Sequence, residues 1–366
     1  MKVVIQNMSR VWGGNEKWLS ILARGLLARG HDVIVSCPRG PVRERIEQLG
    51  IPTTAVRPRG ALDFVSGLSF AAWLRNESPD ALLMTSWHSV AWSALAARLA
   101  RKPRVVLRQG IVRQAPARGA RARALRNDVD AMIVNSPEIK HEWLRSAPGF
   151  DPEKIHIVLN AIELRIEERV AFRRKLRSEL SADNGTLLIG SAGNLFKRKG
   201  FDVLLRGFAD SKVEAAHLVI AGDGEERENL ESLALELGVQ DRVHWLGQRT
   251  DAPEVIAGLD IFVLSSSNEG MANVMLEAMA GGTPVIAFDI SGVVTAIGES
   301  ADRPVAGWIV PLSDTKALAD AIARVAKLIA NKSDEIPARV TEAAWRIESW
   351  FGTERMVDEC ERILFQ

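Results

Sequence analysis

Short apolar runs alternate along the chain with longer stretches in which apolar residues recur every three or four positions. The first run, Lys2–Asn7, predicts a strand. The next stretch, Asn15–Arg29, predicts a helix because its tryptophan and leucines share one face, and Gly30 ends that helix. Asp32–Cys37 predicts the second strand. These strand-like runs are β-branched and apolar on both faces, a pattern typical of parallel sheets covered by helices.

The alternation falls into two series. The first continues with predicted strands at Ala81–Thr85, Arg104–Gln109, Ala131–Asn135 and Lys154–Leu159. After a charged segment, Glu163–Asn184, the second has predicted strands at Thr186–Ser191, Ala216–Ala221, Arg242–Leu246, Asp260–Leu264, Thr283–Ala287 and Gly307–Val310. Two such series predict an α/β protein with two doubly wound, Rossmann-like domains facing each other across a cleft. We expect these domains at residues 1–164 and 165–344, with the helical stretch 345–366 as a candidate addition to the first.

Composition narrows the function classes. The 366 residues are 47% hydrophobic and 25% charged with a net charge of +1, which excludes a disordered chain and gives no whole-protein field for nucleic acid. The two cysteines, Cys37 and Cys360, have no metal-ligand spacing and indicate a reducing compartment. No apolar run is long enough to span a membrane, and the run after Met1 is too short for a signal peptide. A cytoplasmic protein is therefore expected.

The segment 265–284 carries the most informative pattern. A strand ends in a polar loop, and Glu269 and Gly270 lead into a helix that runs to about Ala280. The start of a helix suits a phosphate because its N–H groups and dipole are positive. Glu277 is the only charge in the apolar run Val274–Ala280, so its carboxylate needs a partner. From the pattern alone, a bound ribose diol or a structural arginine would serve equally.

The spacing of Glu269 and Glu277 resembles the Glu-x7-Glu signature of family 4 retaining glycosyltransferases, which have the GT-B fold. Weaker resemblances follow in the family's order over nearly the whole chain: Gly13–Gly14, Val134–Ser136, Leu159–Ile162, Lys197–Phe201 and Ala221–Gly224. The resemblance implies transfer of a sugar from a nucleotide-sugar donor to an acceptor hydroxyl, with retention at the anomeric carbon. It further implies that the second domain holds the donor and the first the acceptor.

The resemblance also assigns roles to residues of the second domain. It places Glu277 on the donor ribose and Glu269, the catalytic residue, on the transferred sugar. Arg198 and Lys199 would neutralise the departing diphosphate, since such cations stabilise the transition state most; by themselves they are a solvated basic turn. The backbone that would hold the diphosphate is that of Gly270, Met271, Ala272, Asn273 and Val274.

In the first domain, Gly13 and Gly14 resemble the family's glycine loop and are expected to contact the diphosphate, with a tight turn without ligand as the alternative. Asn194, a further donor-binding candidate, stands where the family often has arginine. Gln109 stands where many relatives have histidine, so a basic group is lost there. His88 follows another strand of this domain and is a candidate for acceptor contact and catalysis, with a structural histidine as the alternative.

Two further motifs concern the base and a metal. Gly247 and Arg249, after a second-domain strand, are candidates for binding the base. Asp128 and Asp130 are similar to a metal-binding DxD motif, but they precede a strand and therefore lie away from the ligand edge of the sheet. We expect a helix end and strand entry there, a metal-independent reaction and no cofactor.

The stretch Arg98–Arg126 holds ten Lys and Arg residues and no Asp or Glu. A solvated basic face is one explanation. The other is that the stretch steers the enzyme to an anionic membrane surface or a lipid-linked acceptor, which would make it peripheral on the inner face of the membrane. Nucleic acid is not expected, since no aromatic residue separates the arginines.

The expected function is synthesis of a cell-surface polysaccharide, lipopolysaccharide or glycolipid from a nucleotide-sugar, with UDP as the expected nucleotide. A nucleotide-sugar epimerase of the same fold and a non-catalytic solute-binding protein are the alternatives. An NAD-dependent dehydrogenase is disfavoured because the third glycine of the dinucleotide fingerprint is missing after Gly14.

Overall fold

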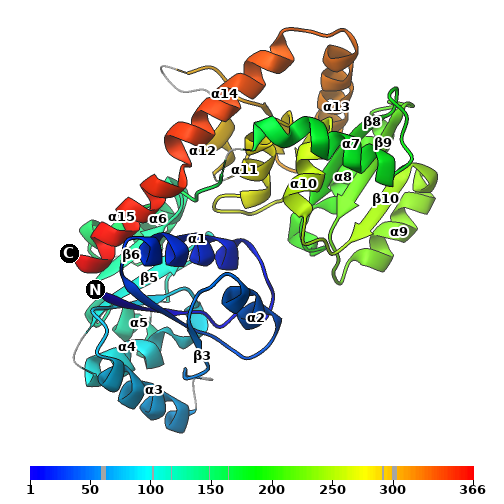
Figure 1. The fold of residues 1–366 in the computed structure, drawn as a ribbon. Helices are drawn as coiled ribbons and strands as arrows, with labels where there is room; N and C mark the ends of the chain where they lie inside the picture. Colours follow the sequence, from blue (N-terminus) through cyan, green and yellow to red (C-terminus); the bar gives the residue numbers. More distant parts are fainter. Residues whose placement is uncertain are drawn as a thin grey trace. The chain divides into compact units, whose positions relative to one another are not determined.

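The computed structural model divides the chain into two compact units (Figure 1). Unit 1 comprises Met1–Ala161 and Phe351–Gln366, and unit 2 comprises Ile162–Trp350. The structure describes residues 1–58, 63–100, 103–116, 118–147, 149–163, 165–290, 292–298 and 303–366. Within these ranges, no helix is both long enough and apolar enough to cross a bilayer.

Unit 1 contains, in its described residues, a parallel sheet of seven strands in the order β3-β2-β1-β4-β5-β6-β7. Its strands are β1 (Lys2–Gln6), β2 (Asp32–Ser36), β3 (Thr53–Thr54), β4 (Ala81–Met84), β5 (Arg104–Gln109), β6 (Ala131–Val134) and β7 (Ile155–Ile157). Its helices are α1 (Gly14–Ala28), α2 (Pro41–Gln48), α3 (Phe64–Glu77), α4 (Val90–Leu99), α5 (Gly119–Asn127), α6 (Pro137–Ser146) and α15 (Thr353–Phe365).

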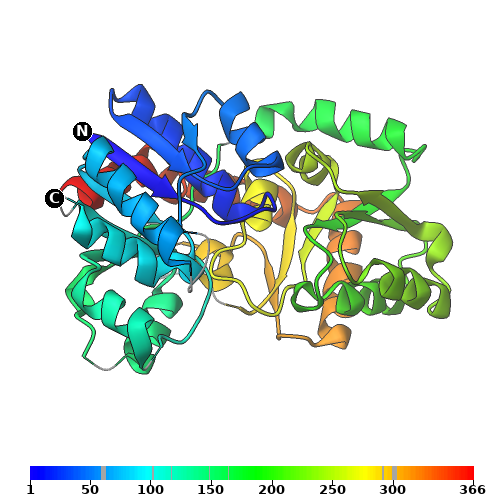
Figure 2. The same ribbon diagram turned by 90° about the horizontal axis from the view of Figure 1, so that it is seen from below.

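The alternation of side chains along β1 divides the core of unit 1 between two faces. Val3 and Ile5 pack with α1, α2 and α15, while Val4 packs with α3, α4, α5 and α6 on the opposite face. The C-terminal helix α15 lies beside α1 (Figure 1). Their approach is close, since a Cβ built on Gly25 would lie 2.4 Å from a methyl of Val357. Both termini lie on the same side of unit 1 in the two views (Figures 1 and 2).

Unit 2 contains, within its described residues, a six-stranded parallel sheet in the order β10-β9-β8-β11-β12-β13. Its strands are β8 (Leu187–Ala192), β9 (Ala216–Ala221), β10 (Val243–Gly247), β11 (Ile261–Leu264), β12 (Val285–Phe288) and β13 (Trp308–Val310). Its helices are α7 (Arg169–Glu179), α8 (Phe201–Asp210), α9 (Arg227–Glu236), α10 (Ala252–Gly258), α11 (Asn273–Ala280), α12 (Val293–Ile297), α13 (Thr315–Ala330) and α14 (Glu335–Trp350). Strands β11 and β12 are buried throughout, as expected for a sheet covered on both faces.

The predicted fold class, two doubly wound Rossmann-like domains, is confirmed. All the strands predicted from apolar runs are present, with ends shifted by up to two residues. The two-residue edge strand β3 was not predicted, because its sequence, Thr53–Thr54, is too short for a periodic pattern. The long C-terminal helical stretch is broken near Gly352: α14 belongs to unit 2, and α15 packs in unit 1.

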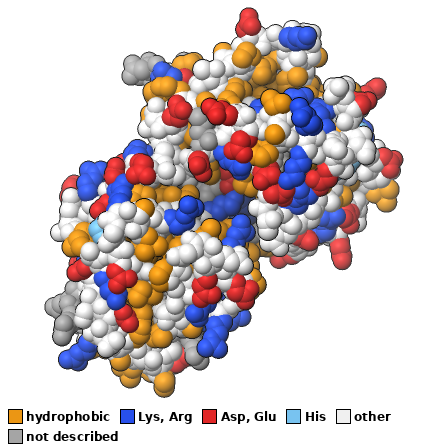
Figure 3. Space-filling model, in the orientation of Figure 1, with side chains coloured by type: hydrophobic (Ala, Val, Ile, Leu, Met, Phe, Trp, Pro, Cys, Tyr) orange, Lys and Arg blue, Asp and Glu red, His pale blue; other side chains and the backbone are white. Residues whose placement is uncertain are grey.

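The surface charge is mixed in sign. On the face drawn in Figure 3, Lys and Arg side chains lie among Asp and Glu side chains. This agrees with the net charge of +1 and with the many ion pairs of the structure, such as Lys175 with Glu254 at 2.8 Å.

Candidate functional site

The order of the strands places a ligand crevice in unit 2. The chain passes from β8 outward to β9 and β10 and then returns to β11, which pairs directly with β8 in parallel. In open α/β sheets, ligands bind beyond the carboxyl ends of the strands at the point where the strand order reverses. In unit 2 that point lies between the loops that follow β8 and β11.

These two loops are tied together by hydrogen bonds. The Ser265 hydroxyl donates to the Lys199 carbonyl at 2.9 Å, and the Ser267 backbone N–H donates to the Arg198 carbonyl at 2.8 Å. The Ser267 hydroxyl donates to the same carbonyl of Arg198 at 3.0 Å. The serines after β11 therefore hold the backbone of the basic turn Lys197–Lys199 against the end of the neighbouring strand.

Three charged side chains meet at this point. Arg198 Nη1 lies 3.0 Å from Glu269 Oε1, and Lys199 Nζ contacts the same carboxylate oxygen. The Lys199 and Glu269 side chains are only 15% and 12% exposed, whereas Arg198 is 48% exposed. The structure thus brings together two predicted diphosphate ligands and the predicted sugar ligand, from segments about 70 residues apart.

Helix α11 begins just beyond Glu269 and carries Glu277. The N-cap residue of α11 is Ala272, whose side chain cannot accept a hydrogen bond from the first turn of the helix. The positive end of the helix dipole lies at Met271–Val274. Glu277 is 4% exposed on the same helix. The glycine at 292 lets α12 approach the loop, because a Cβ there would lie 2.0 Å from the carbonyl oxygen of Gly270.

Asn194 lies in the loop after β8, where its carbonyl accepts from the backbone N–H of Phe196 at 2.8 Å. A Cβ built on its neighbour Gly193 would lie 3.9 Å from Lys199 Nζ. Lys199, from the basic turn, therefore places a positive charge beside this loop. Many family members instead have an arginine at the position of Asn194. Donor contact by Asn194 stays a prediction.

The two residues predicted to bind the base lie at the end of β10. Gly247 is the last residue of the strand and has a left-handed φ of +64°. The Arg249 guanidinium is held by Asp251, with Nε to Oδ1 at 2.7 Å, and by Glu179. These ion pairs raise the pKa of Arg249 and lower the pKa of Asp251. Arg249 thus joins α7 to the loop after β10, and its contact with a base stays a prediction.

In unit 1, the glycine loop is organised by Glu16. This buried carboxylate accepts from the Gly13 backbone N–H, from Asn7 Nδ2 and from Asn15 Nδ2, each at 3.0 Å. The contact with Gly13 is the capping-box arrangement in which the third helical residue reaches back to the N-cap. The Gly13 N-cap and the first turn of α1, which begins at Gly14, are therefore held by a side chain of the same helix.

A buried arginine in unit 1 was not predicted from the sequence. Arg108, on β5, donates to Asn15 Oδ1 at 2.8 Å and to Asn160 Oδ1 at 3.2 Å and lies over the Trp18 ring at 4.3 Å. Burial lowers its pKa to about 10. A charged residue directly after the apolar run Val105–Leu107 was the available signal, but the basic stretch around it gave that charge another explanation. Gly110 lies beside it, and a Cβ there would be 2.8 Å from Arg108 Nη1, so a side chain at this position would shift the guanidinium.

The other first-domain candidates lie near the same strand ends. His88 lies in a short 3₁₀ turn, Trp87–Ser89, and its side chain is outside the described residues. Gln109 donates from Nε2 to the carbonyl of Ile111 at 2.8 Å. The helix end and strand entry expected at the DxD-like pair are present: Asp128 is the C-cap of α5, and Asp130 accepts from the backbone N–H of Val105 at 2.7 Å, at the amino ends of the strands.

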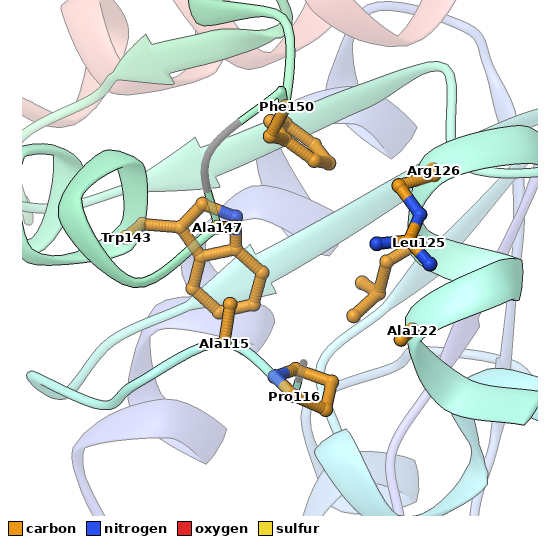
Figure 4. Close-up of a pocket in the computed structure, with 8 residues that line it drawn as sticks. All are labelled: Ala115, Pro116, Ala122, Leu125, Arg126, Trp143, Ala147 and Phe150. Carbon is orange, nitrogen blue, oxygen red and sulfur yellow. The ribbon is translucent and has the colours of Figure 1, made fainter. Parts of the chain in front are cut away.

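The basic stretch Arg98–Arg126 does not form one continuous charged face. Arg108 is buried, Arg104 donates to the carbonyl of Ile363 at 2.7 Å, and residues 101, 102 and 117 lie outside the described part. The exposed arginines of the described part of this stretch are Arg98, Arg118, Arg123 and Arg126. Of these, Arg126 lines an apolar pocket between α5, α6 and the loop after β5. Figure 4 shows the residues that line it: Ala115, Pro116, Ala122, Leu125, Arg126, Trp143, Ala147 and Phe150.

Comparison with known proteins gives relatives along both units. Residues 172–344 match the family model described as glycosyl transferases group 1, and residues 12–165 match that of glycosyltransferase family 4. A lipopolysaccharide core biosynthesis glycosyltransferase of Rhizobium meliloti is 28% identical over 315 residues, which cover 86% of this chain and 85% of that protein. A second one from the same organism is 34% identical over 46% of this chain and 49% of its own length.

Solved structures share the fold along the whole chain. An Anabaena protein crystallised in complex with UDP-glucose has a TM-score of 0.84 at 20% identity and covers 100% of this chain and 99% of its own. A Rickettsia africae glycosyltransferase has a TM-score of 0.85 at 17% identity, over 99% of this chain and 97% of its own. Two matched family models, on either side of the boundary between the units, identify the chain as a member of the family 4 glycosyltransferases with the GT-B fold.

Proposed function

We propose that this glycosyltransferase takes its sugar from a uridine diphosphate donor, and that the pocket formed by the basic turn, Glu269 and the start of α11 holds that donor. The observation that carries the proposal is the convergence of Arg198 and Lys199 at the strand-order reversal of unit 2. Two cations beside a helix start suit a diphosphate. The UDP-glucose bound to the Anabaena neighbour supports uridine as the base.

The proposed roles follow from the charge that develops during transfer. As the anomeric C–O bond breaks, the diphosphate gains negative charge, which Arg198, Lys199 and the backbone of residues 270–274 stabilise. Glu277 accepts from the ribose hydroxyls, and Glu269 accepts from hydroxyls of the sugar. Gly13 and Gly14 offer backbone that a phosphate can approach closely.

We further propose that the reaction retains the anomeric configuration and needs no metal. Arg198 and Lys199 offer two side-chain cations to the diphosphate, and such cations can stabilise the leaving group in the role that a divalent ion would otherwise have. Transfer from an α-linked donor should then yield an α-linked product by NMR, with the same rate in EDTA as in magnesium. A β-linked product, or loss of turnover in EDTA that magnesium restores, would contradict this.

The acceptor is proposed to be a hydroxyl of a lipopolysaccharide core or related cell-envelope glycan. The names of the two Rhizobium relatives support this class. The test incubates the protein with UDP-glucose, UDP-galactose or UDP-N-acetylglucosamine, with and without a truncated lipopolysaccharide acceptor. Sugar on the acceptor and released UDP are expected. An isomerised donor sugar in the absence of acceptor would indicate an epimerase instead.

We propose that the enzyme works on the inner face of the membrane through the exposed arginines of the stretch Arg98–Arg126 in unit 1. Exposed arginines contribute about 1 kcal/mol each near anionic lipid. Vesicles with phosphatidylglycerol should sediment the protein at low salt, while phosphatidylcholine vesicles should not. R123E/R126E should abolish sedimentation, and R206E/K316E, the same charge change on exposed positions of unit 2, should not. Equal binding to both vesicle types would contradict the proposal.

A further inference from the structure

The carboxylate of Glu269 occupies the two cations that the proposed diphosphate needs. Arg198 Nη1 and Lys199 Nζ converge on one oxygen, Oε1. Lys199 and Glu269 are both largely covered, so their contact is less screened by water than a surface pair is. Glu269 and a bound diphosphate therefore compete for the same positive charge.

The competition involves the side chains of Arg198 and Lys199 and leaves their backbone in place. The carbonyls of Arg198 and Lys199 are held by Ser267 and Ser265, so the backbone of the turn is braced in the absence of ligand. The third basic residue of the turn, Lys197, pairs with Asp202 at 3.1 Å and takes no part in the Glu269 contact. Binding of a diphosphate thus requires Glu269 to give up its partners without a rearrangement of the turn.

We propose that Glu269 makes the site discriminate between the sugar-loaded donor and the spent nucleoside diphosphate. This inference rests on the proposed function of the site. When a diphosphate takes Arg198 and Lys199, the carboxylate loses both partners and lies beside added negative charge. The hydroxyls of a donor sugar replace the lost hydrogen bonds, whereas free UDP has no sugar to do so.

The consequence is a specific weakening of product binding. The ion pairs of Glu269 with Arg198 and Lys199 must break before either nucleotide binds, which lowers the affinity for both. Only the donor compensates for this, because the hydroxyls of its sugar form new hydrogen bonds with Glu269. The affinity for free UDP is therefore lower than it would be if Glu269 did not compete for Arg198 and Lys199. This lower affinity favours release of UDP after transfer. This assigns Glu269 a part in specificity and product release in addition to its contact with the sugar.

The test is the affinity of the whole protein for UDP and for UDP-glucose by isothermal titration calorimetry. Glu269→Gln keeps the side-chain shape but removes the charge that competes with the diphosphate. We expect the variant to bind UDP about threefold to fivefold more tightly than the wild type, since a partly exposed ion pair contributes up to about 1 kcal/mol, which corresponds to about fivefold in affinity. UDP-glucose affinity is expected to stay equal or to fall, so the ratio of the two dissociation constants shifts.

Asp202→Asn is the matched control, because it removes one negative charge from the adjacent first turn of α8, where Asp202 pairs with Lys197. Both affinities of this variant should lie within about twofold of the wild type. Glu269→Ala provides a second variant and should also tighten UDP binding.

Unchanged or weaker UDP binding by the folded Glu269 variants would overturn the inference. Equal tightening in Asp202→Asn would overturn it too, because the effect would then be one of general charge. Failure of the wild type to bind UDP or UDP-glucose would overturn the proposed donor instead.

Discussion

Gly200 lies so close to the backbone of Ser265 that a Cβ at position 200 would be 2.1 Å from the Ser265 carbonyl oxygen. Gly200 also has a left-handed φ of +64° and serves as the N-cap of α8. The end of the basic turn and the end of β11 can therefore meet only if residue 200 has no side chain.

Gly200→Ala should lower both stability and UDP affinity. The left-handed conformation costs alanine about 1–2 kcal/mol, and the clash with Ser265 adds to this by forcing the two loops apart. Gly238→Ala is the control, since Gly238 has a φ of +67° and a Cβ there would meet no other atom within 4 Å. Thermal melts and UDP titrations of both variants separate the conformational cost from the clash. Equal effects of the two substitutions would contradict this prediction.

Lys199→Ala and Arg198→Ala should weaken UDP binding, with the larger effect for the more buried Lys199. Each removes a cation beside the proposed diphosphate, and charge-assisted contacts of this kind contribute about 1.5–3 kcal/mol. Lys197→Ala, at a side chain 72% exposed, should leave affinity nearly unchanged. The measurement is the UDP-induced rise in melting temperature, since a ligand of the folded state stabilises it. If all three variants responded to UDP like the wild type, the nucleotide would have to bind elsewhere.

Arg108→Met should destabilise the protein by about 1–3 kcal/mol, because it leaves the amide oxygens of half-buried Asn15 and buried Asn160 without their arginine donor. Arg113→Met removes an arginine that lies over the Trp87 ring at 5.5 Å without being buried, and should change stability by less than about 0.5 kcal/mol. Chemical denaturation of both variants tests the difference. A wild-type midpoint for Arg108→Met would show that the network contributes little.

Stability should fall as the solution is acidified from neutral pH toward pH 5, partly through His244. His217 Nδ1 and His244 Nε2 lie 2.8 Å apart, and burial together with His217 lowers the pKa of His244 below its ordinary 6.5. The unfolded chain then binds the proton more readily, so the stability present above the ordinary value is lost as the pH falls through the folded-state value.

His244→Gln should reduce this loss of melting temperature between about pH 7.5 and about pH 5.5, the range that spans the ordinary histidine pKa. His141→Gln, at an exposed histidine of α6, should not reduce it. Identical pH profiles for the wild type and His244→Gln would contradict the assignment.

The predictable part of the site was its location along the chain. The loops after β8 and β11 were expected from the apolar runs before them, and the helix after Glu269 was expected from its apolar sequence, which became α11. Arg249 shows why a loop position alone was not enough. Its ion pairs with Asp251 and Glu179 join segments that no local pattern connects.

The sequence by itself determined the elements and their order, because strand and helix patterns depend on neighbours within a few residues. Apolar strands such as Lys2–Gln6 and Ala216–Ala221 are buried on both faces, and their composition alone indicates this. Only the tertiary structure decided which distant side chains meet. Glu269 with Lys199, and Arg108 with Asn15 and Asn160, join residues tens of positions apart through strand pairing. Such contacts depend on how the strands pair and how closely the loops approach, down to the absence of a methyl group at Gly200.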